Sequence, residues 1–340
     1  MATIREVAKN AGVSIATVSR VLNHPDTVAP ETSAHILKVM DDLDFSPNGP
    51  ARSLALKKTY TIGLLVPDIL NPVYPEIAKG VGEIVNKKGF QLLLCNTEGL
   101  RKKETEYIQS LESRKVDGLI LTDSQLPDEE IERLKKQDTK IVHVGKKRGF
   151  GADGAVFTDF SLGAFMAVSH LTTLGYKKIA FISGPEDHLE NREKGEGYRK
   201  ALGEAALPLD SRFTLSGDND IEGGYLAAKK LLKMKTPPEA IFAAGDLMAI
   251  GAMEAVKSEN LRIPEDVAIV GYDNIRISAL VEPKLTTITY PVYRMGLIAA
   301  RLLFNSIDNG STEPENIYLE PGLVVRRSCG NTERVTEIFN

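Results

Sequence analysis

The chain has 340 residues, of which 42% are hydrophobic and 26% are charged, values typical of a folded globular protein. This composition excludes a disordered chain, and at roughly 150 residues per domain the length predicts about two domains with room for a small third. The 42 basic and 46 acidic residues give a net charge of −4, which excludes a polybasic nucleic-acid coat but allows a local DNA-binding surface.

The cysteines and histidines indicate the cellular compartment and whether a metal site is expected. The two cysteines, Cys95 and Cys329, cannot build a disulfide framework, which favours a reducing intracellular compartment. The five histidines have no metal-ligand spacing, so we expect neither a metal nor another cofactor. The N-terminus has no apolar signal core, and no apolar run approaches the ~20 residues of a membrane-spanning helix. We therefore expect a cytoplasmic protein that does not contact a membrane.

Three regions of different pattern follow one another along the chain. Residues 1–46 predict short helices without a strand, and residues 47–59 combine Pro, Gly and basic residues in a way typical of a linker. From residue 60 onward, short apolar segments alternate with amphipathic helical ones, which predicts βαβ units. The expected strands are 61–67, 90–96, 118–122, 140–145, 177–184, 240–245, 267–273 and 286–291. Two similar runs of these units indicate an α/β fold with two doubly wound lobes, in which ligands bind beyond the carboxyl ends of the strands.

The N-terminal region has the features of a helix-turn-helix. Thr3 and Glu6 form a T-x-x-E capping box at the start of a first helix, and Gly12 permits the positive φ of a turn after it. Ser14 is expected to cap a second helix whose inward face holds Val18. A third helix is expected over 30–43, with four inward residues: Ile36, Leu37, Met40 and Leu43.

The second helix is the candidate for reading DNA. A helix-turn-helix places this helix in the major groove, where Arg20 can bond guanine with two hydrogen bonds. Ile15 and Ala16 can contact the methyl groups of thymine, and hydroxyl groups near the helix start can hold phosphates. The alternative is a small helical bundle with no ligand.

A series of motifs then runs through the whole chain in one order. They are VAKNAGVSIATVSRVLN, FSPNGPARSLA, TIGLLVPDILNPVYPEI, KVDGLIL, GYKKIAFISGP, GYRKAL, AAGDLMAIGAM, VAIVGYDNIRIS and LTTI. The series resembles the LacI/GalR (lactose-repressor/galactose-repressor) family of bacterial transcription regulators. The resemblance implies a helix-turn-helix headpiece (1–46), a hinge helix or linker (47–59) and a core of two lobes of periplasmic-binding-protein type (60–340). Lobe one would comprise about 60–159 and 291–320, and lobe two about 160–290 and 321–340.

The resemblance also implies how the chain meets DNA. In the family, the hinge helix folds on operator DNA, and a leucine from each protomer, here Leu54, wedges the central base step of a palindromic operator. The Gly49-Pro50 pair departs from the family pattern and indicates a hinge helix that starts later or is less stable. The tail 330–340 is too short for several leucine heptads, which favours a homodimer. The expected DNA-binding residues are Thr3, Ser14, Ile15, Ala16, Thr17, Ser19, Arg20, Asn23, Ala51, Arg52, Leu54 and Lys57.

A small-molecule effector is expected in the cleft between the lobes. Carboxylates such as those of Asp246 and Asp273 can accept paired hydroxyl bonds from a sugar, and Tyr74 can give flat apolar contact. The matching positions are Asp68, Asn71, Val73, Tyr74, Asp123, Ser124, Phe160, Arg192, Lys194, Asn219, Asp246 and Asp273. Structural roles are the alternatives: Asp246 can cap a helix, Asp68 can cap a turn, and Tyr74 can be a core aromatic.

The expected function is therefore repression controlled by a sugar or sugar phosphate. The family often has Arg where this chain has Lys194, and the two are not interchangeable at bidentate sites. A purine-type co-repressed regulator, or one controlled by a phosphocarrier protein, remains the alternative. A nucleotide-dependent enzyme is disfavoured because GVG at 80–82 lacks the third glycine and GKK at 145–147 lacks Walker spacing. A solute-binding protein of a transport system would lack the helix-turn-helix.

Overall fold

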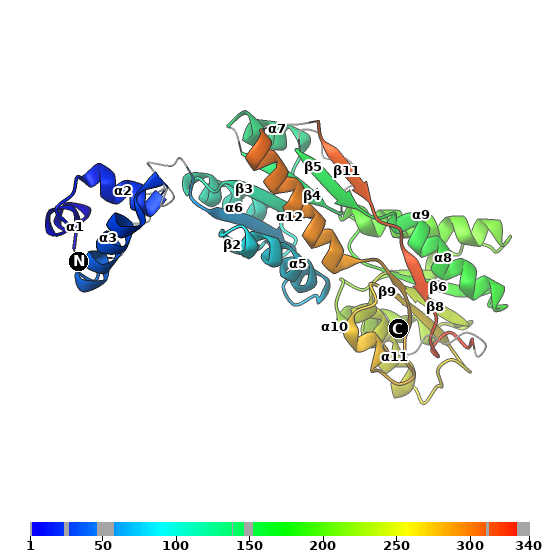
Figure 1. The fold of residues 1–340 in the computed structure, drawn as a ribbon. Coiled ribbons are helices and arrows are strands. Elements are labelled where there is room, and N and C mark those ends of the chain that lie inside the picture. The colour runs from blue at the N-terminus through cyan, green and yellow to red at the C-terminus, as the bar shows by residue number, and fades with distance from the viewer. Residues whose placement is uncertain are drawn as a thin grey trace. The chain divides into compact units, whose positions relative to one another are not determined.

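The computed structural model describes residues 2–23, 27–45, 58–137, 139–145, 152–310 and 313–331. The chain divides into two compact units, Met1–Thr59 and Tyr60–Asn340, which we call the headpiece and the core (Figure 1). In these described ranges, no helix is long and apolar enough to cross a membrane. The same ranges hold no group of three or more His, Cys, Asp or Glu side chains that could bind a metal ion.

The headpiece consists of α1 (Ile4–Asn10), α2 (Ile15–Asn23) and α3 (Pro30–Asp42) around a small apolar core. Ile36 and Met40 of α3 are buried in this core, and Leu43 packs against it. The prediction that Leu37 also points inward is wrong, because Leu37 is 53% exposed. Positions 36, 40 and 43 lie on one face of a helix, whereas position 37 lies roughly 100° around the axis from position 36.

Lobe one of the core is built on a parallel sheet of order β11-β5-β4-β3-β1-β2. Its strands are β1 (Thr61–Val66), β2 (Gln91–Asn96), β3 (Gly118–Thr122), β4 (Lys140–Val144), β5 (Gly154–Phe157) and β11 (Glu315–Tyr318). Helices α5 (Val73–Lys87) and α12 (Val292–Asn309) cover one face, and α6 (Arg101–Ser113) and α7 (Asp128–Lys136) cover the other (Figure 1). Along β1, Leu64 faces the first helix pair and Leu65 faces the second, as the two-residue strand period requires.

The first glycine of the GVG sequence, Gly80, serves helix packing. A Cβ atom on Gly80 of α5 would lie 2.2 Å from the carbonyl oxygen of Tyr293, and one on Gly296 of α12 would lie 2.2 Å from that of Ile77. Helices α5 and α12 therefore approach so closely that only glycine fits on both sides of the contact.

Lobe two repeats this organisation on a sheet of order β12-β10-β9-β8-β6-β7, in which β12 runs antiparallel to β10. Its strands are β6 (Ile179–Ser183), β7 (Thr214–Ser216), β8 (Ala240–Ala243), β9 (Ala268–Tyr272), β10 (Thr286–Thr289) and β12 (Gly322–Val324). Helices α8 (Phe160–Thr173) and α9 (Leu189–Glu204) lie side by side, as do α10 (Ile221–Leu232) and α11 (Asp246–Ser258) (Figure 1). The two predicted doubly wound lobes are thus confirmed. The sequence did not predict β5, β7, β11 and β12, because each has only three or four residues and three of them are not fully buried.

The chain passes between the lobes three times. The crossings lie between β5 and α8, between β10 and α12, and between β11 and β12. These three crossings hold the lobes next to each other. The carboxyl ends of the strands in both sheets face the cleft between the lobes.

Candidate DNA-binding helix and ligand cavity

The predicted caps of the headpiece helices are present. The backbone N–H of Thr3 donates to Glu6 Oε2 at 2.7 Å, and the N–H of Glu6 donates to Thr3 Oγ1 at 3.4 Å, which completes the capping box. Gly12 has φ +66°, as predicted for the turn. Ser14 Oγ accepts the N–H of Thr17 at 3.1 Å at the start of α2. These contacts satisfy backbone donors that a helix start leaves unpaired, at about 0.5–2 kcal/mol for each cap.

Helix α2 has an apolar inner face and an open outer face. Val18 and Val21 are buried in the headpiece core, whereas Ile15 is 46% exposed and Arg20 is exposed. An isoleucine that leaves this much apolar surface in water on a recognition helix is suited to contact thymine methyl groups.

The predicted DNA-binding residues form two groups: those whose side chains the structure describes and those that lie outside the described residues. Thr3, Ser14, Ile15, Ala16, Thr17, Ser19 and Arg20 are all exposed or half-buried. Asn23 ends α2, and its side chain lies outside the described residues. Ala51, Arg52, Leu54 and Lys57 also lie outside the described residues.

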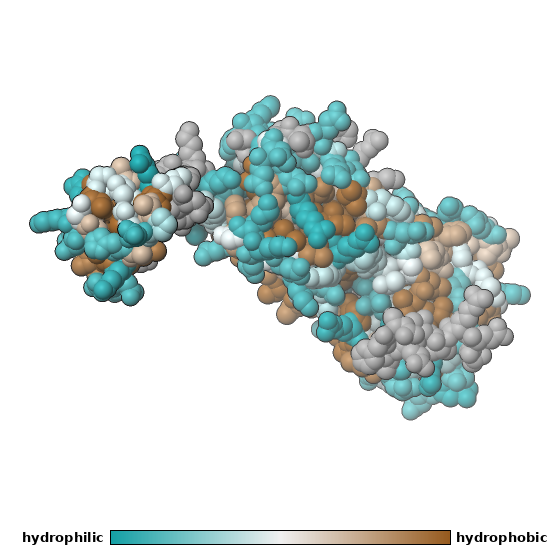
Figure 2. All heavy atoms as spheres, viewed as in Figure 1, coloured by the Kyte–Doolittle hydropathy of each residue, from teal (hydrophilic) through white to brown (hydrophobic). Residues whose placement is uncertain are grey.

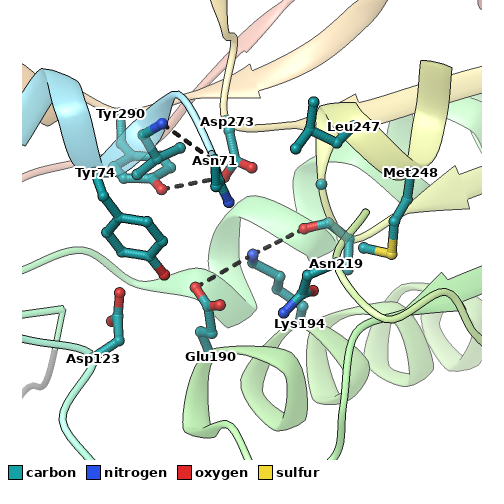
Figure 3. A pocket seen from close by; sticks show the side chains of 13 residues that line it. Asn71, Tyr74, Asp123, Glu190, Lys194, Asn219, Leu247, Met248, Asp273 and Tyr290 are labelled. Carbon is teal, nitrogen blue, oxygen red and sulfur yellow. Dashed lines mark hydrogen bonds and ion pairs between the residues drawn. The ribbon is translucent and has the colours of Figure 1, made fainter. Parts of the chain in front are cut away.

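A cavity opens where the carboxyl ends of the two sheets meet (Figure 3). Lobe one contributes Asn71 before α5, Tyr74 on α5 and Asp123 directly after β3. Lobe two contributes the loops after β7, β8 and β9 and the first turns of α9. The full lining is Asn71, Val73, Tyr74, Asp123, Glu190, Lys194, Asn219, Ala244, Gly245, Leu247, Met248, Asp273 and Tyr290.

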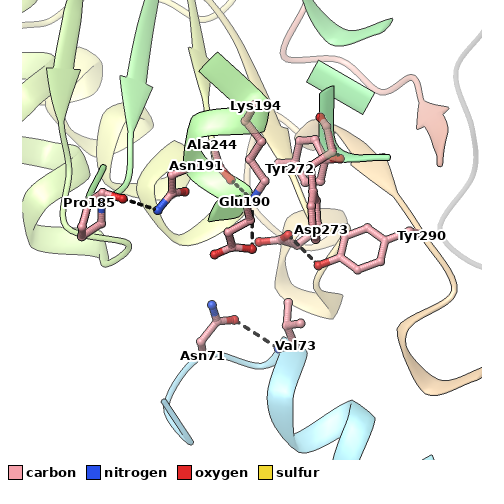
Figure 4. A network of polar contacts seen from close by, with 11 residues as sticks. Asn71, Val73, Pro185, Glu190, Asn191, Lys194, Ala244, Tyr272, Asp273 and Tyr290 are labelled. Atoms are coloured by element: carbon pink, nitrogen blue, oxygen red, sulfur yellow. Dashed lines mark hydrogen bonds and ion pairs between the residues drawn. The ribbon is translucent and has the colours of Figure 1, made fainter. Parts of the chain in front are cut away.

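Lys194 is the cation of this cavity, and its charge is already engaged. Its Nζ donates to the carbonyl oxygen of Ala244 at 2.9 Å and lies 3.6 Å from Glu190 Oε2 (Figure 4). The ammonium also lies 4.4 Å from the centre of the Tyr272 ring. Burial lowers the pKa of Lys194, but Glu190, Asp273 and Asp123 more than offset this effect, so the pKa is raised. Lys194 therefore stays charged inside the cavity wall.

Two carboxyl groups face the cavity from opposite lobes. Burial raises the pKa of Asp123 well above its ordinary value and Glu190 raises it further, while the hydrogen bond with Tyr74 lowers it. Burial raises the pKa of Asp273 to about 7, against the lowering effect of Lys194. The Tyr290 hydroxyl donates to Asp273 Oδ1 at 3.1 Å. A carboxyl group with a raised pKa can both accept hydrogen bonds from hydroxyl groups and, when protonated, donate one.

Several site residues adopt a left-handed backbone conformation. Asp123 has φ 45°, Asn219 has φ 61° and Asp273 has φ 106°. Each such conformation costs about 1–3 kcal/mol in a residue with a side chain, and such costs concentrate at binding sites. Glycines make room for two of these side chains: a Cβ atom on Gly145 would lie 2.0 Å from Asp123 Oδ1, and one on Gly184 would lie 1.9 Å from Asn219 Oδ1.

The structure brings most of the predicted effector residues together. Asn71, Val73, Tyr74, Asp123, Lys194, Asn219 and Asp273 line the cavity. Ser124 and Arg192 line an adjoining cavity that shares Asp123 and Glu190 with the first and also contains Arg101 and His188. Asp68, Phe160 and Asp246 line neither cavity.

These three residues have supporting positions. Asp68 Oδ1 accepts the N–H of Leu70 at 2.9 Å in the turn after β1. Phe160 is buried, and its ring packs edge-on against Tyr290, with centroids 5.9 Å apart. Asp246 is fully buried and does not cap α11, because Gly245 occupies the N-cap position. The Asp246 carboxylate instead accepts the hydroxyl of Thr287 at 2.6 Å and the N–H of Ile275 at 2.9 Å.

The sequence interpretation missed Glu190 and Tyr290, although signals for both were present. Glu190 precedes Lys194 by four residues on α9, a spacing that puts both side chains on one helix face. Tyr290 directly follows β10, at the carboxyl end of a parallel strand, where ligands bind in such sheets.

A helix-turn-helix unit and a two-lobed core with a polar cavity together define a ligand-controlled DNA-binding regulator. Two family models match the chain. "Bacterial regulatory proteins, lacI family" matches residues 3–48, and "Periplasmic binding proteins and sugar binding domain of LacI family" matches residues 59–325.

Curated relatives match over nearly the full chain. The chain is 35% identical over 327 residues to catabolite control protein A of Priestia megaterium, covering 96% of this chain and 98% of that protein. It is 34% identical to the HTH-type transcriptional repressor PurR of Photobacterium profundum, with coverage of 96% and 98%. It is 34% identical to the ribose operon repressor of Escherichia coli, with coverage of 97% and 100%.

Solved structures agree with these relatives. A complex of the transcriptional regulator CelR with cellobiose superposes with a TM-score of 0.73 at 32% identity, covering 96% of this chain and all of that chain. The lac repressor dimer bound to operator and an anti-inducer gives a TM-score of 0.85 at 25% identity, covering 96% and 99%. The chain belongs to the LacI family of bacterial transcription regulators, whose members are not enzymes. It is a DNA-binding transcriptional repressor with a sugar-binding domain.

Proposed function

We propose that this repressor binds a palindromic operator as a homodimer and that a neutral sugar in the core cavity sets its operator affinity. The observation that carries the choice of ligand is the hydrogen-bonding character of the cavity. Asp123, Glu190 and Asp273 line it, and Lys194, the one cation among its described lining residues, already contacts Glu190 and the Ala244 carbonyl. Sugar hydroxyl groups can exchange hydrogen bonds with these carboxyl groups, whereas a phosphate group would find no cation in this lining that is not already paired.

The remaining lining suits a sugar ring. The side-chain amides of Asn71 and Asn219 can donate and accept, and Tyr74 and Met248 add apolar surface. The similarity to the ribose operon repressor and to the CelR–cellobiose complex supports a sugar for this chain. The adjoining cavity differs in its lining, because it contains the basic side chains Arg101, His188 and Arg192, which a phosphate group could use.

The DNA contacts follow from the headpiece and the segment after it. We assign residues 1–46 to the headpiece, 47–59 to a hinge and 60–340 to the core. The outward residues of α2, above all Ile15 and Arg20, read base edges in the major groove, and Leu54 enters the minor groove.

Exposed apolar side chains on the core support a homodimer. Leu70 is 82% exposed and Leu94 is 48% exposed on lobe one, and Leu280 is 69% exposed on lobe two. Leu94 belongs to β2, an edge strand, where an uncovered apolar residue invites a partner. Figure 2 shows apolar residues reaching the surface of the core among hydrophilic ones. The similar lac repressor structure contains a dimer bound to operator, and a dimer fits two headpieces to two half-sites.

Control of DNA binding by the sugar follows from where the cavity lies. A ligand that contacts both Asp123 of lobe one and Asp273 of lobe two favours one angle between the lobes. In a dimer this angle sets the separation of the two hinge segments and therefore the fit to the operator.

The test uses the full-length chain in two steps. Selection of bound duplexes from a random DNA pool should enrich an inverted repeat. Calorimetry with ribose, cellobiose, other neutral sugars, sugar phosphates and purines should then give heat with a neutral sugar. A sugar phosphate or a purine as the ligand would overturn the choice of effector, and enrichment of a single half-site would overturn the dimer.

A further inference from the structure

Asn274 lies next to Asp273 but lines neither cavity. It is half-buried and has φ 51°, a left-handed conformation that Asn adopts more readily than most residues. The loop that presents Asp273 to the ligand therefore continues directly into a residue whose side chain faces other parts of lobe two.

The Asn274 side chain connects two segments that lie next to crossings between the lobes. Its Nδ2 donates to Thr289 Oγ1 at 3.3 Å, and Thr289 ends β10 just before the chain enters α12 of lobe one. Its Oδ1 accepts Nη2 of Arg326 at 2.7 Å. Arg326 follows β12, the strand through which the chain returns to lobe two.

Arg326 is well placed to hold this connection. It is 5% exposed, and its Nη1 donates to the carbonyl oxygen of Leu285 at 2.7 Å and to Ser278 Oγ at 3.2 Å. A buried guanidinium whose two terminal nitrogens are both hydrogen-bonded keeps a fixed orientation. Asn274 is thus clamped between a rigid arginine and the end of β10.

The other bonds of the loop after β9, residues 273–275, which we call the ligand loop, lie within lobe two, as those of Asn274 do. The Tyr290 hydroxyl bonds Asp273 in the cavity (Figure 4), and Asp246 holds the N–H of Ile275. In the described core, Asn274 joins the loop through its side chain to residues beside two different crossings.

We propose that Asn274 is a positioning residue that fixes the ligand loop to the crossings on β10 and β12 and thereby restricts the angle between the lobes. This inference rests on the proposed function for its regulatory meaning. The restriction itself is a property of the ligand-free core and can be measured without sugar or DNA.

The experiment measures the distance between spin labels on the two lobes by pulsed electron resonance. Labels are placed through Lys102→Cys on α6, whose side chain is 89% exposed, and Lys257→Cys on α11, which is exposed. Both native cysteines are buried, so the introduced thiols react preferentially. Labelled full-length chain is mixed with excess unlabelled chain, so that an assembly carries one labelled copy.

Three variants separate positioning from general loosening. Asn274→Gly keeps the left-handed backbone but removes both side-chain bonds, and it should broaden the distance distribution. Asn274→Asp keeps the acceptor for Arg326 and can accept the Thr289 hydroxyl in place of donating to it, so it should restore a distribution close to wild type. Asn260→Gly is the matched control, because Asn260 is an exposed residue of lobe two with φ 55° and should leave the distribution unchanged.

The outcomes decide the proposal. An unchanged distribution in Asn274→Gly, or equal broadening in Asn260→Gly, would overturn it. Thermal unfolding reports whether each variant folds, since Asn274→Gly leaves a buried Arg326 donor without its acceptor. If that variant does not fold, Thr289→Val removes only the Nδ2 contact, and an unchanged distribution there would contradict the proposal. Failure to find a sugar or an operator would weaken the proposed function and leave this result standing.

Discussion

The headpiece and the core differ in whether they bury polar and charged side chains. The described headpiece buries Val7, Val18 and Ile36 in an apolar core, and none of its polar or charged residues is fully buried. The core buries Lys194 and Asp246 and surrounds them with hydrogen-bond partners. A surface that meets DNA works through exposed side chains, whereas a ligand cavity needs charges held in fixed positions away from water.

Removal of a buried side chain from the apolar core of the headpiece tests this difference with the largest expected effect. Ile36→Ala removes a fully buried side chain and should destabilise the headpiece by about 2–5 kcal/mol, with loss of operator binding. Leu37→Ala is the matched control, since Leu37 is 53% exposed, and it should change stability by no more than about 0.5 kcal/mol. Limited proteolysis and calorimetry of the full chain check both variants. Loss of sugar binding in Ile36→Ala would contradict the independence of the two units.

The next effect concerns the carboxyl groups of the cavity. Asp273→Asn keeps the shape but removes a carboxylate acceptor, which at pH 8, above the pKa of about 7, should weaken sugar binding by about 1.5–3 kcal/mol, or roughly 10- to 150-fold. Asp68→Asn is the control, because Asp68 lies outside the cavity and bonds Leu70 in its own turn. Titration calorimetry gives both affinities. Equal sugar affinity in Asp273→Asn and wild type would remove Asp273 from the site.

The pH dependence of stability should also differ between the two units. Burial raises the pKa of Asp273 to about 7, so the folded core binds a proton that the unfolded chain has already released above its ordinary value of 3.8. This contribution to the free energy of unfolding is full below the ordinary pKa and is lost as pH rises through about 7. The core of the wild type should therefore lose more stability between about pH 5 and pH 8 than that of Asp273→Asn, as thermal unfolding across this range would show. Identical pH profiles would place the titrating group elsewhere.

The smallest expected effect lies at the first cap of the headpiece. Thr3→Ala removes the hydroxyl that accepts the N–H of Glu6 and should destabilise the headpiece by about 1 kcal/mol. Thr3→Ser keeps this acceptor and should stay close to wild type. Operator titrations at rising temperature would separate the two, and equal losses in both variants would argue for a direct DNA contact by the threonine methyl group.

The alternation of apolar strands and helices predicted the fold because each buried strand of a parallel sheet carries a continuous apolar run. The candidate cavity was predictable where side chains follow strands, as Asp123 and Asp273 do. Asp246 shows the limit, because it also follows a strand. Its carboxylate turns inward to Thr287, which lies 41 positions along the chain, and no local pattern reports that contact. Leu37 shows the same limit on a smaller scale, since an apolar residue beside a helical stripe need not belong to it.

The central claim is that sugar in the cavity and DNA at the headpiece are energetically coupled. The direct measurement is the Kd of the full-length repressor for its selected duplex, with and without saturating sugar, together with the Kd for the sugar with and without the duplex. The account predicts that the two ratios differ from one by the same factor, because coupling between two sites is reciprocal. Ratios of one in both directions would show that the cavity does not control the operator.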